Sequence, residues 1–243
     1  MIRVLADELP EPGGEWTPSD EEAHHLVRVR RVKPGQAVEV IDGQGGAVRG
    51  VIAQVSKRSA SIQIKERIDE QRESSLDLTI VAAIPVQANT FDAALPGLVQ
   101  LGVIRIILTP TAYGGKLKKD LTRYSQRLQD IAANALKQSG RLVMPGFTFY
   151  QSWEETCRRL AQQAGLKLLF HPNSEEVQVT DKVTAVTLCI GPEGGFSDEE
   201  VALAQTHSIQ TQGLGPRILK METALIGATF WAQQRFGDLN LTI

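Results

Sequence analysis

Five apolar runs in the C-terminal two thirds of the sequence are the feature that most constrains the fold. The runs are almost continuous in Val, Ile, Leu and Ala, and segments with helical periodicity separate them. Strands that are covered on both faces of a parallel sheet have this composition, and strands that alternate with helices indicate an α/β domain. We therefore predict strands at residues 76–84, 103–109, 166–170, 185–190 and 209–214.

Three of the remaining segments have apolar residues at helical spacing. The segment 121–140 carries one apolar stripe and ends at a glycine, which is typical of a helix C-terminus. A last helix is predicted over 225–236 and a weaker one over 90–101. Because Pro96 and Gly97 lie inside the weaker pattern, we predict a kink or a break there.

The first part of the sequence consists of short β-branched runs. Turn signals rich in Gly, Pro, Asp and Ser separate HHLVRVRRV, AVEVID, AVRGVIAQVS and SASIQIKERI. Closely spaced strands of this kind predict a small β-barrel. The polar segment 69–75 is predicted to be a linker, so we place the barrel domain at 1–73 and the α/β domain at 74–243.

Composition disfavours several classes of protein. The hydrophobic fraction of 42% is ordinary for a folded protein, and no stretch reaches the roughly 18 apolar residues of a membrane span. Neither Cys157 and Cys189 nor the four histidines have the spacing of a metal site. The acidic, proline-containing start is unlike a signal peptide. We predict a cytoplasmic protein without a metal ion and without membrane contact.

Basic residues are concentrated in two segments, although the net charge is only −2. Residues 24–67 contain nine Lys or Arg against three acids, and residues 105–141 contain eight against two. Either segment alone is equally well explained as a solvated face. Two such segments in a slightly acidic chain favour RNA or DNA as a partner.

A glycine-rich turn, Gly-Pro-Glu-Gly-Gly (191–195), follows the fourth predicted strand. Ser197 and Glu200 then have the spacing of a capping box for a following helix. Such turns often bind phosphate, but four acids at and after the turn would repel a polyphosphate, and the dinucleotide and P-loop fingerprints are absent. The stretch is therefore either a tight turn without a ligand or a site for a neutral or cationic ligand.

Two further loops, 171–173 and 213–220, follow predicted strands of the same domain. Loops at the carboxyl ends of neighbouring parallel strands converge on one crevice. The histidine, arginine and lysine in these loops would individually more often be structural or solvated. Three loops directed to one place favour a ligand pocket.

These stretches resemble a known family. LCIGPEGGFSDEEV and LGPRILKMETALIGATFWAQQRFGDL are similar to the two signature stretches of the RsmE-type methyltransferases of the SPOUT class. QSGR at 138–141 resembles the end of that family's central helix, and HHLVRVRRVKPGQAVEVIDGQGG resembles its N-terminal PUA-like domain. The resemblance covers nearly the whole chain.

The resemblance implies an N-terminal PUA-like β-barrel, a SPOUT α/β domain with a C-terminal trefoil knot, and a homodimer. It implies an enzyme that uses S-adenosylmethionine to methylate N3 of a uridine in 16S ribosomal RNA of the small subunit. A sulfonium cofactor without phosphate suits a glycine loop among carboxylates. By similarity, the cofactor-binding residues are His171, Pro172, Gly191, Glu193, Gly194, Gly195, Leu214, Gly215, Ile218 and Leu219.

The implied chemistry is attack of uracil N3 on the sulfonium methyl group, which needs an ionised uracil or a positioned base. Arg217 and Arg141 are candidates for stabilising charge on the uracil oxygens or for gripping a phosphate. Glu222 is a candidate base, but it could equally cap a helix or pair with Arg217. The predicted RNA-binding residues are Arg28, Arg30, Arg31, Lys33, Lys116, Lys118 and Lys119.

The sequence departs from the family pattern on the substrate side. Gln100 and a Pro-Gly pair lie in a helix that usually carries charges, Lys137 replaces a Glu, and TPTAYGG (109–115) replaces a Ser-Glu-Arg run. These departures leave open a related methyltransferase with a different RNA target, or a non-catalytic rRNA-binding protein. A dinucleotide-dependent oxidoreductase is disfavoured because its fingerprint is absent.

Overall fold

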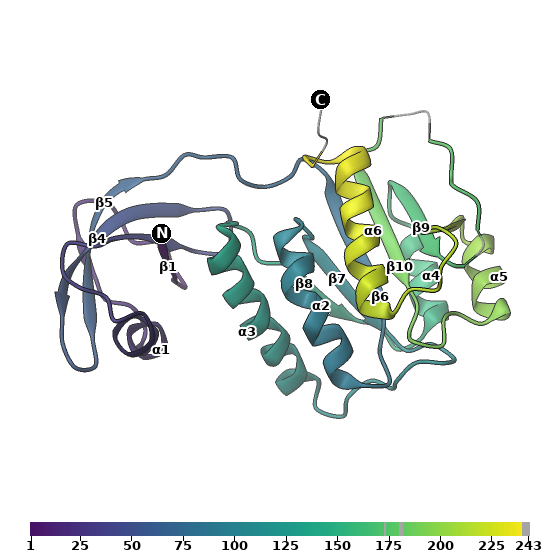
Figure 1. Cartoon of the computed structure of the whole chain (residues 1–243), viewed down its shortest axis with the longest axis horizontal. Coiled ribbons are helices and arrows are strands. Elements are labelled where there is room, and N and C mark those ends of the chain that lie inside the picture. Colours follow the sequence, from purple (N-terminus) through teal and green to yellow (C-terminus); the bar gives the residue numbers. More distant parts are fainter. Residues whose placement is uncertain (173, 180–181, 240–243) are drawn as a thin grey trace. The chain divides into compact units, whose positions relative to one another are not determined.

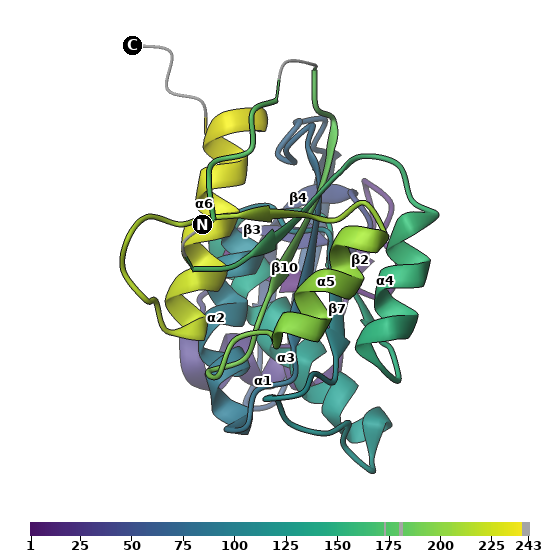
Figure 2. The ribbon, with the colours of Figure 1, turned by 90° about the vertical axis from the view of Figure 1, so that its right-hand side faces the viewer.

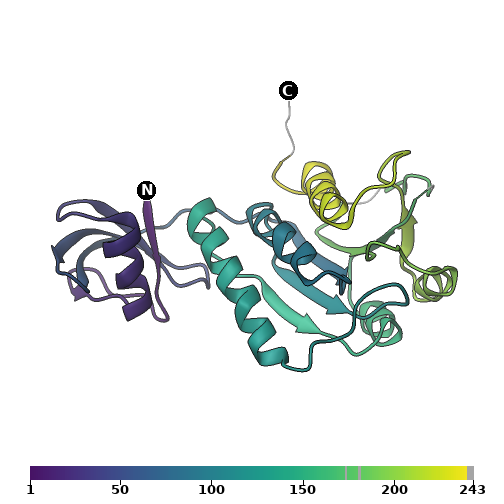
Figure 3. The same cartoon turned by 60° about the horizontal axis from the view of Figure 1, so that its bottom comes forward.

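The computed structural model describes residues 1–172, 174–179 and 182–239. These residues form two compact units. The first unit comprises Met1–Glu73 together with Ala133–Met144, and the second comprises Ser74–Ala132 together with the chain from Pro145 onward. The long helix α3 (Leu121–Ser139), which is continuous in Figure 3, therefore contributes residues to both units.

The first unit is built on one five-stranded sheet with the order β1-β3-β4-β5-β2. β1 pairs with β3 in parallel, and the other neighbouring strands are antiparallel. The core of the unit is made of Val and Ile side chains from these strands together with Leu26. The strands are β1 (Ile2–Leu5), β2 (Glu15–Trp16), β3 (Ala37–Ile41), β4 (Ala47–Val55) and β5 (Ala60–Arg67).

The strand predicted at HHLVRVRRV is wrong. The first seven of these residues belong to the end of the helix α1 (Asp20–His24) and to a π-helical segment, η1 (His25–Arg30). Ser19 starts the helix, because its side chain accepts a hydrogen bond from the backbone N–H of Glu22 at 3.4 Å. The alternation of Val and Arg does not bury one apolar face, since Val29 is 62% exposed.

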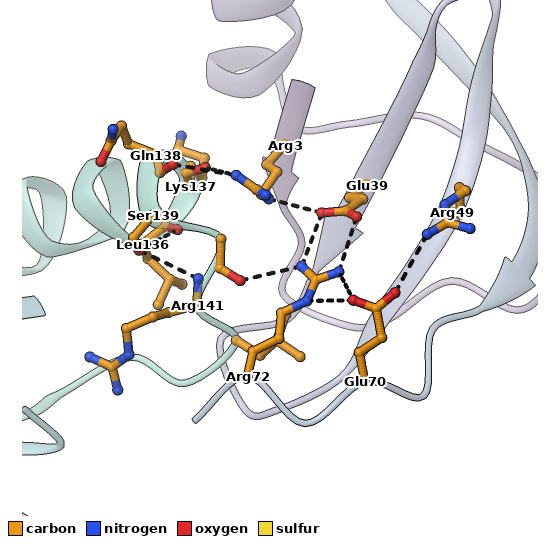
Figure 4. A network of polar contacts seen from close by, with 12 residues as sticks. Arg3, Glu39, Arg49, Glu70, Arg72, Leu136, Lys137, Gln138, Ser139 and Arg141 are labelled. Atoms are coloured by element: carbon orange, nitrogen blue, oxygen red, sulfur yellow. Dashed lines mark hydrogen bonds and ion pairs between the residues drawn. The ribbon is translucent and has the colours of Figure 1, made fainter. Parts of the chain in front are cut away.

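Charged groups hold the end of α3 within the first unit (Figure 4). Arg3 donates to Glu39 at 2.8 Å and to the carbonyl of Lys137 at 3.0 Å. Arg72 donates to both carboxylate oxygens of Glu39 at 3.1 Å and to the carbonyl of Gly140 at 3.3 Å. Burial by itself would raise the pKa of Glu39, but the hydrogen bonds and charges of Arg72 and Arg3 outweigh it and lower that pKa. A segment from the middle of the chain thus completes the first unit.

The second unit contains a six-stranded sheet with the order β11-β9-β10-β6-β7-β8, in which every neighbouring pair is parallel. The predicted α/β class and all five predicted strands are confirmed. The edge strand β8 was not predicted because alternate residues in Gly-Phe-Thr-Phe are exposed. The strands are β6 (Asp77–Ala83), β7 (Arg105–Thr109), β8 (Gly146–Phe149), β9 (Leu166–Phe170), β10 (Ala185–Ile190) and β11 (Gln210–Gln212).

Helices cover both faces of this sheet (Figures 1 and 2). The helices α2 (Ala88–Gln100) and α6 (Met221–Phe236) lie on one face, and α4 (Trp153–Ala161) and α5 (Asp198–Thr206) lie on the other. Of the predicted kink or break in α2, the break is wrong, because the helix continues through Pro96. A β-carbon at Gly97 would lie 2.4 Å from Ile226 Cδ1, so this glycine lets α2 and α6 pack closely. Each helix of the described chain is too short or too polar to be a membrane span.

Candidate functional site

The loops that follow β9, β10 and β11 surround one pocket of the second unit. These strands are parallel neighbours, so their carboxyl ends lie at the same edge of the sheet. The pocket has a volume of about 300 Å³ and the predicted convergence of the three loops is confirmed. Its lining includes all ten residues predicted to bind a cofactor: His171, Pro172, Gly191, Glu193, Gly194, Gly195, Leu214, Gly215, Ile218 and Leu219.

The glycine turn after β10 is closed tightly on itself. The N–H of Gly195 donates to the carbonyl of Pro192 at 2.9 Å, and Gly195 has a left-handed φ of 74°. A β-carbon at Gly191 would lie 3.1 Å from the carbonyl carbon of Gly195. The turn therefore needs glycine at these positions, where it presents backbone atoms rather than side chains to the pocket.

Two carboxylates near this turn fasten it to neighbouring loops. Glu193 accepts hydrogen bonds from the N–H of Val86 at 3.3 Å and from Thr90 Oγ1 at 3.2 Å. Glu200 accepts from the N–H of Ala112 at 2.7 Å and from the N–H of Ser197 at 2.9 Å. The predicted capping box of α5 is present. The loops after β6, β7 and β10 are thus joined, although the sequence indicated no such partners.

Arg217, in the loop after β11, and Glu222, just beyond that loop, differ in their position relative to the pocket. Arg217 lines the pocket and is exposed, and the neighbouring Ile218 is 88% exposed. Glu222 lies in the first turn of α6, where a carboxylate stabilises the helix dipole, and it is not part of the pocket lining. The geometry therefore brings Arg217, but not Glu222, to the predicted cofactor residues.

Arg141 belongs to the first unit. The residue is only 5% exposed, and its Nε donates to Glu73 Oε2 at 2.8 Å. The other oxygen of Glu73 accepts from the backbone N–H groups of Leu142 and Val143 at 2.8 and 3.2 Å. These contacts give Arg141 a role in holding the linker to the chain that follows α3. Its predicted role toward the substrate gains no support from this geometry.

The predicted RNA-binding residues are exposed in both units. Arg28 and Arg30 lie in η1, and Arg31 follows it with a left-handed φ of 51°. Lys33 lies in the turn before β3, and Lys116, Lys118 and Lys119 lie between β7 and α3. Arg30 also lines a first-unit pocket of about 330 Å³, together with Met1, Arg3, His25, Asn134, Lys137 and Gln138.

Basic side chains are prominent in the lining of the first-unit pocket. Burial and the positive charges of Lys137 and Arg30 lower the pKa of His25, and the charge of Glu22 only partly opposes this. The sequence alone did not suggest that Lys137 would approach these residues, because it lies more than a hundred positions away.

The two cysteines have no features of a reactive site. Both are buried and unbridged. Burial raises the pKa of Cys157 to about 12 and also raises the pKa of Cys189, so neither thiol ionises readily near neutral pH. Within the described residues, no group of three or more His, Cys, Asp or Glu side chains is arranged to hold a metal ion.

Comparison with known families identifies the kind of protein that has this pocket. Residues 72–233 match the model of the RNA methyltransferase domain, and residues 18–65 match the model of the RNA methyltransferase PUA domain. The chain belongs to the RNA methyltransferase family. The family models agree with the resemblance to the RsmE-type enzymes, and they assign a PUA domain to the sheet of the first unit.

Individual relatives agree with this assignment. The ribosomal RNA small subunit methyltransferase E of Synechocystis is 28% identical, over 83% of this chain and 67% of its own. The enzyme of that name from Neisseria gonorrhoeae, solved with S-adenosylmethionine bound, is 27% identical, with a TM-score of 0.88 over 98% of this chain and 99% of its own. A Legionella pneumophila protein described as a methyltransferase with bound cofactor SAM is 28% identical, with a TM-score of 0.88 over 98% of each chain.

Proposed function

We propose that this RNA methyltransferase transfers the methyl group of S-adenosylmethionine to N3 of a uridine in 16S ribosomal RNA. The observation that carries the proposal is the pocket formed by the loops after β9, β10 and β11, whose lining contains every residue of the two signature stretches predicted to bind the cofactor. The relatives solved with the same cofactor support this assignment.

The residues of the pocket fit S-adenosylmethionine. Phe170, Ile190 and Leu214 offer apolar surface for an adenine ring, and the glycine turn offers backbone hydrogen-bonding groups. Glu193 belongs to the pocket lining, and its negative charge suits a positively charged ligand and opposes a phosphate. When bound, the cofactor supplies an activated methyl group on a sulfonium.

Arg217 is the residue that we assign to the substrate. It lines the same pocket as the glycine turn, and its guanidinium would stabilise negative charge on a uracil oxygen as N3 loses its proton. We assign Glu222 to the start of α6 rather than to proton transfer, because it lies outside the pocket lining. Arg141 is assigned to the Glu73 contact.

The two predicted domains divide the work in this proposal. Residues 1–73 form a PUA-like barrel that binds RNA through Arg28, Arg30, Arg31 and Lys33. Residues 74–243 form the methyltransferase domain, in which the loops around the pocket belong to a trefoil knot. Lys116, Lys118 and Lys119 add phosphate contacts. The active form is a homodimer that acts in the cytoplasm, where small ribosomal subunits are found.

A methyl-transfer assay tests the proposal. Purified protein, labelled S-adenosylmethionine and small ribosomal subunits from cells that lack the enzyme are incubated, and the RNA nucleosides are identified by mass spectrometry. N3-methyluridine is the expected product. Binding of the cofactor without transfer to ribosomal RNA would instead favour the non-catalytic rRNA-binding protein or a different RNA target.

A matched pair of variants tests the role of Arg217. Arg217→Ala is expected to lower kcat about 100-fold while cofactor affinity changes little, because a charge that acts on the substrate is lost. Lys220→Ala removes a neighbouring cation that is exposed but outside the pocket lining, and it should leave kcat unchanged. Equal effects of the two substitutions would contradict the assignment.

A further inference from the structure

Tyr113 presents an aromatic ring beside the pocket. It lies in the loop after β7 and is 55% exposed. A β-carbon at Gly194 would lie 2.8 Å from Cβ and 3.4 Å from Cγ of Tyr113, so the tyrosine packs directly on the glycine turn. Gly194 in turn lines the pocket. Only a residue without a side chain at position 194 leaves room for Tyr113 in this position.

The backbone around Tyr113 is fixed on both sides. Before it, the N–H of Ala112 donates to Glu200 at 2.7 Å. After it, the N–H of Gly115 donates to the carbonyl of Ile84 at 2.7 Å. A β-carbon at Gly114 would lie 2.7 Å from the carbonyl oxygen of Ile84, so this part of the loop lies tightly against the end of β6. A rigid loop thus holds an exposed ring, and a ring with few rotatable bonds loses little entropy on binding.

The surroundings of Tyr113 have the composition of a surface for single-stranded RNA. Val86, whose N–H donates to Glu193, is 66% exposed, and Ile218 in the pocket lining is 88% exposed. Exposed large apolar side chains therefore gather around the glycine turn. Lys116, Lys118 and Lys119 follow Tyr113 in the chain and are exposed. Aromatic rings for bases next to cations for phosphates are characteristic of single-strand binding.

We propose that Tyr113 stacks on a nucleobase of the RNA substrate and thereby positions the RNA at the pocket. This inference rests on the proposed RNA methyl transfer. Tyr113 belongs to TPTAYGG (109–115), a stretch at which the sequence departs from the RsmE-type pattern.

Kinetics of three variants test the stacking. Tyr113→Ala is expected to lower kcat/KM for the RNA about tenfold, and Tyr113→Phe should restore the value to within about twofold because the ring remains. Tyr113→Leu is the matched control, since it keeps apolar contact with Gly194 but lacks a π face. Its kcat/KM should be as low as that of Tyr113→Ala. Cofactor affinity, measured by calorimetry, should be the same in all four proteins.

A crosslinking experiment separates failure of this inference from failure of the proposed function. RNA containing 5-bromouracil is irradiated on the wild-type protein, and the modified peptide is mapped by mass spectrometry. We expect the crosslink in the tryptic peptide 106–116, on Tyr113. This result supports stacking even if no methyl group is transferred. Wild-type activity in Tyr113→Ala or Tyr113→Leu, a matching loss of cofactor affinity, or a crosslink confined to other peptides would overturn the inference.

Discussion

The tetrapeptide Ser-Asp-Glu-Glu occurs at residues 19–22 and again at 197–200, and the two copies have different surroundings. Each starts a helix, and in each the Ser side chain accepts a hydrogen bond from the N–H of the second Glu. In the second copy the carboxylate of Glu200 returns to its own helix cap and also binds Ala112. In the first copy the carboxylate of Glu22 pairs with Lys137.

The comparison shows that a cap fixes where a helix begins but not how it continues. After the second copy, Val-Ala-Leu-Ala-Gln-Thr completes a regular nine-residue helix. After the first copy, the chain passes into the π-helical η1 and stops at a left-handed Arg31. The carboxylate of Glu200 thus serves both its own helix and a distant loop, whereas that of Glu22 pairs with a distant segment.

Removal of Lys137, the partner of Glu22, should reduce stability more than any other change considered below. Glu22 and Lys137 have side chains that are 12% and 14% exposed, and Glu22 Oε2 has no hydrogen-bond partner among the described residues. Lys137→Met should reduce the free energy of unfolding of the first unit by about 3 kcal/mol, because it leaves a buried carboxylate unpaired. Hydrogen exchange of α1 peptides during urea unfolding measures this. The double variant Glu22→Gln/Lys137→Met should be more stable than Lys137→Met, and a loss below about 1 kcal/mol in the single variant would show that water screens the pair.

Glu200→Ala should have the next largest effect, a loss of about 2 kcal/mol in the second unit. The change removes the acceptor for the N–H groups of Ala112 and Ser197. Glu200→Gln is the matched control, since its amide oxygen still accepts a hydrogen bond. Calorimetric unfolding gives the stability, and hydrogen exchange of residues 110–115 gives the order of the loop. Unchanged exchange at Ala112 in Glu200→Ala would show that this contact does not hold the loop.

Removal of either N-cap hydroxyl should reduce stability by a smaller amount, and the amount should differ between the two helices. Ser197→Ala should cost about 1 kcal/mol, because Ser197 is 8% exposed and water cannot easily replace its oxygen. Ser19 is exposed, so Ser19→Ala should cost about half as much. Thermal unfolding of the two single variants gives the comparison. A larger loss of stability in Ser19→Ala than in Ser197→Ala would contradict this prediction.

The smallest effect on stability should come from His25. This histidine lies six residues after Ser19, and the residue six positions after Ser197 is Leu203. Burial and the charges of Lys137 and Arg30 hold the pKa of His25 below 6.5 in the folded protein. As the pH falls through 6.5, the unfolded chain therefore binds more protons than the folded protein. Titration of His25 thus destabilises the first unit at acidic pH. The helix α5 has no histidine at the equivalent position. An NMR titration of the His25 ring should give a midpoint below 6.5, and Lys137→Met should raise it. A wild-type midpoint at or above 6.5 would contradict this.

Local pattern located five of the six strands of the second unit, and in the first unit it located β3, β4 and β5 but took a helical segment for a strand. The strands around Leu168 and Leu188 are buried on both faces, so their composition reveals them. The carboxyl ends of such strands also locate the pocket. The Val-Arg alternation before Arg31 imitates a strand, although the Ser19 cap, which has the same signature as Ser197, was available to correct it.

Contacts between distant residues account for most of what the sequence did not predict. Glu193 binds Val86, which is 107 positions away, and Glu200 binds Ala112, which is 88 positions away. Arg141 was predicted as a substrate residue from a short motif, but its Nε donates a hydrogen bond to Glu73, 68 positions away. Side chains of this kind are equally compatible with a ligand or with another part of the chain, and the tertiary structure decides between them.

The discontinuity of the first unit has a consequence for how the protein is made. Arg3 and Arg72 bind carbonyl groups of Lys137 and Gly140, and the buried Glu22 pairs with Lys137. During translation the chain up to Glu73 is therefore synthesised well before its remaining part, Ala133–Met144, leaves the ribosome. At about 5–20 residues per second, the nascent first unit waits several seconds without these hydrogen bonds and this ion pair. The unit that begins first along the chain cannot finish folding until more than half of the protein exists.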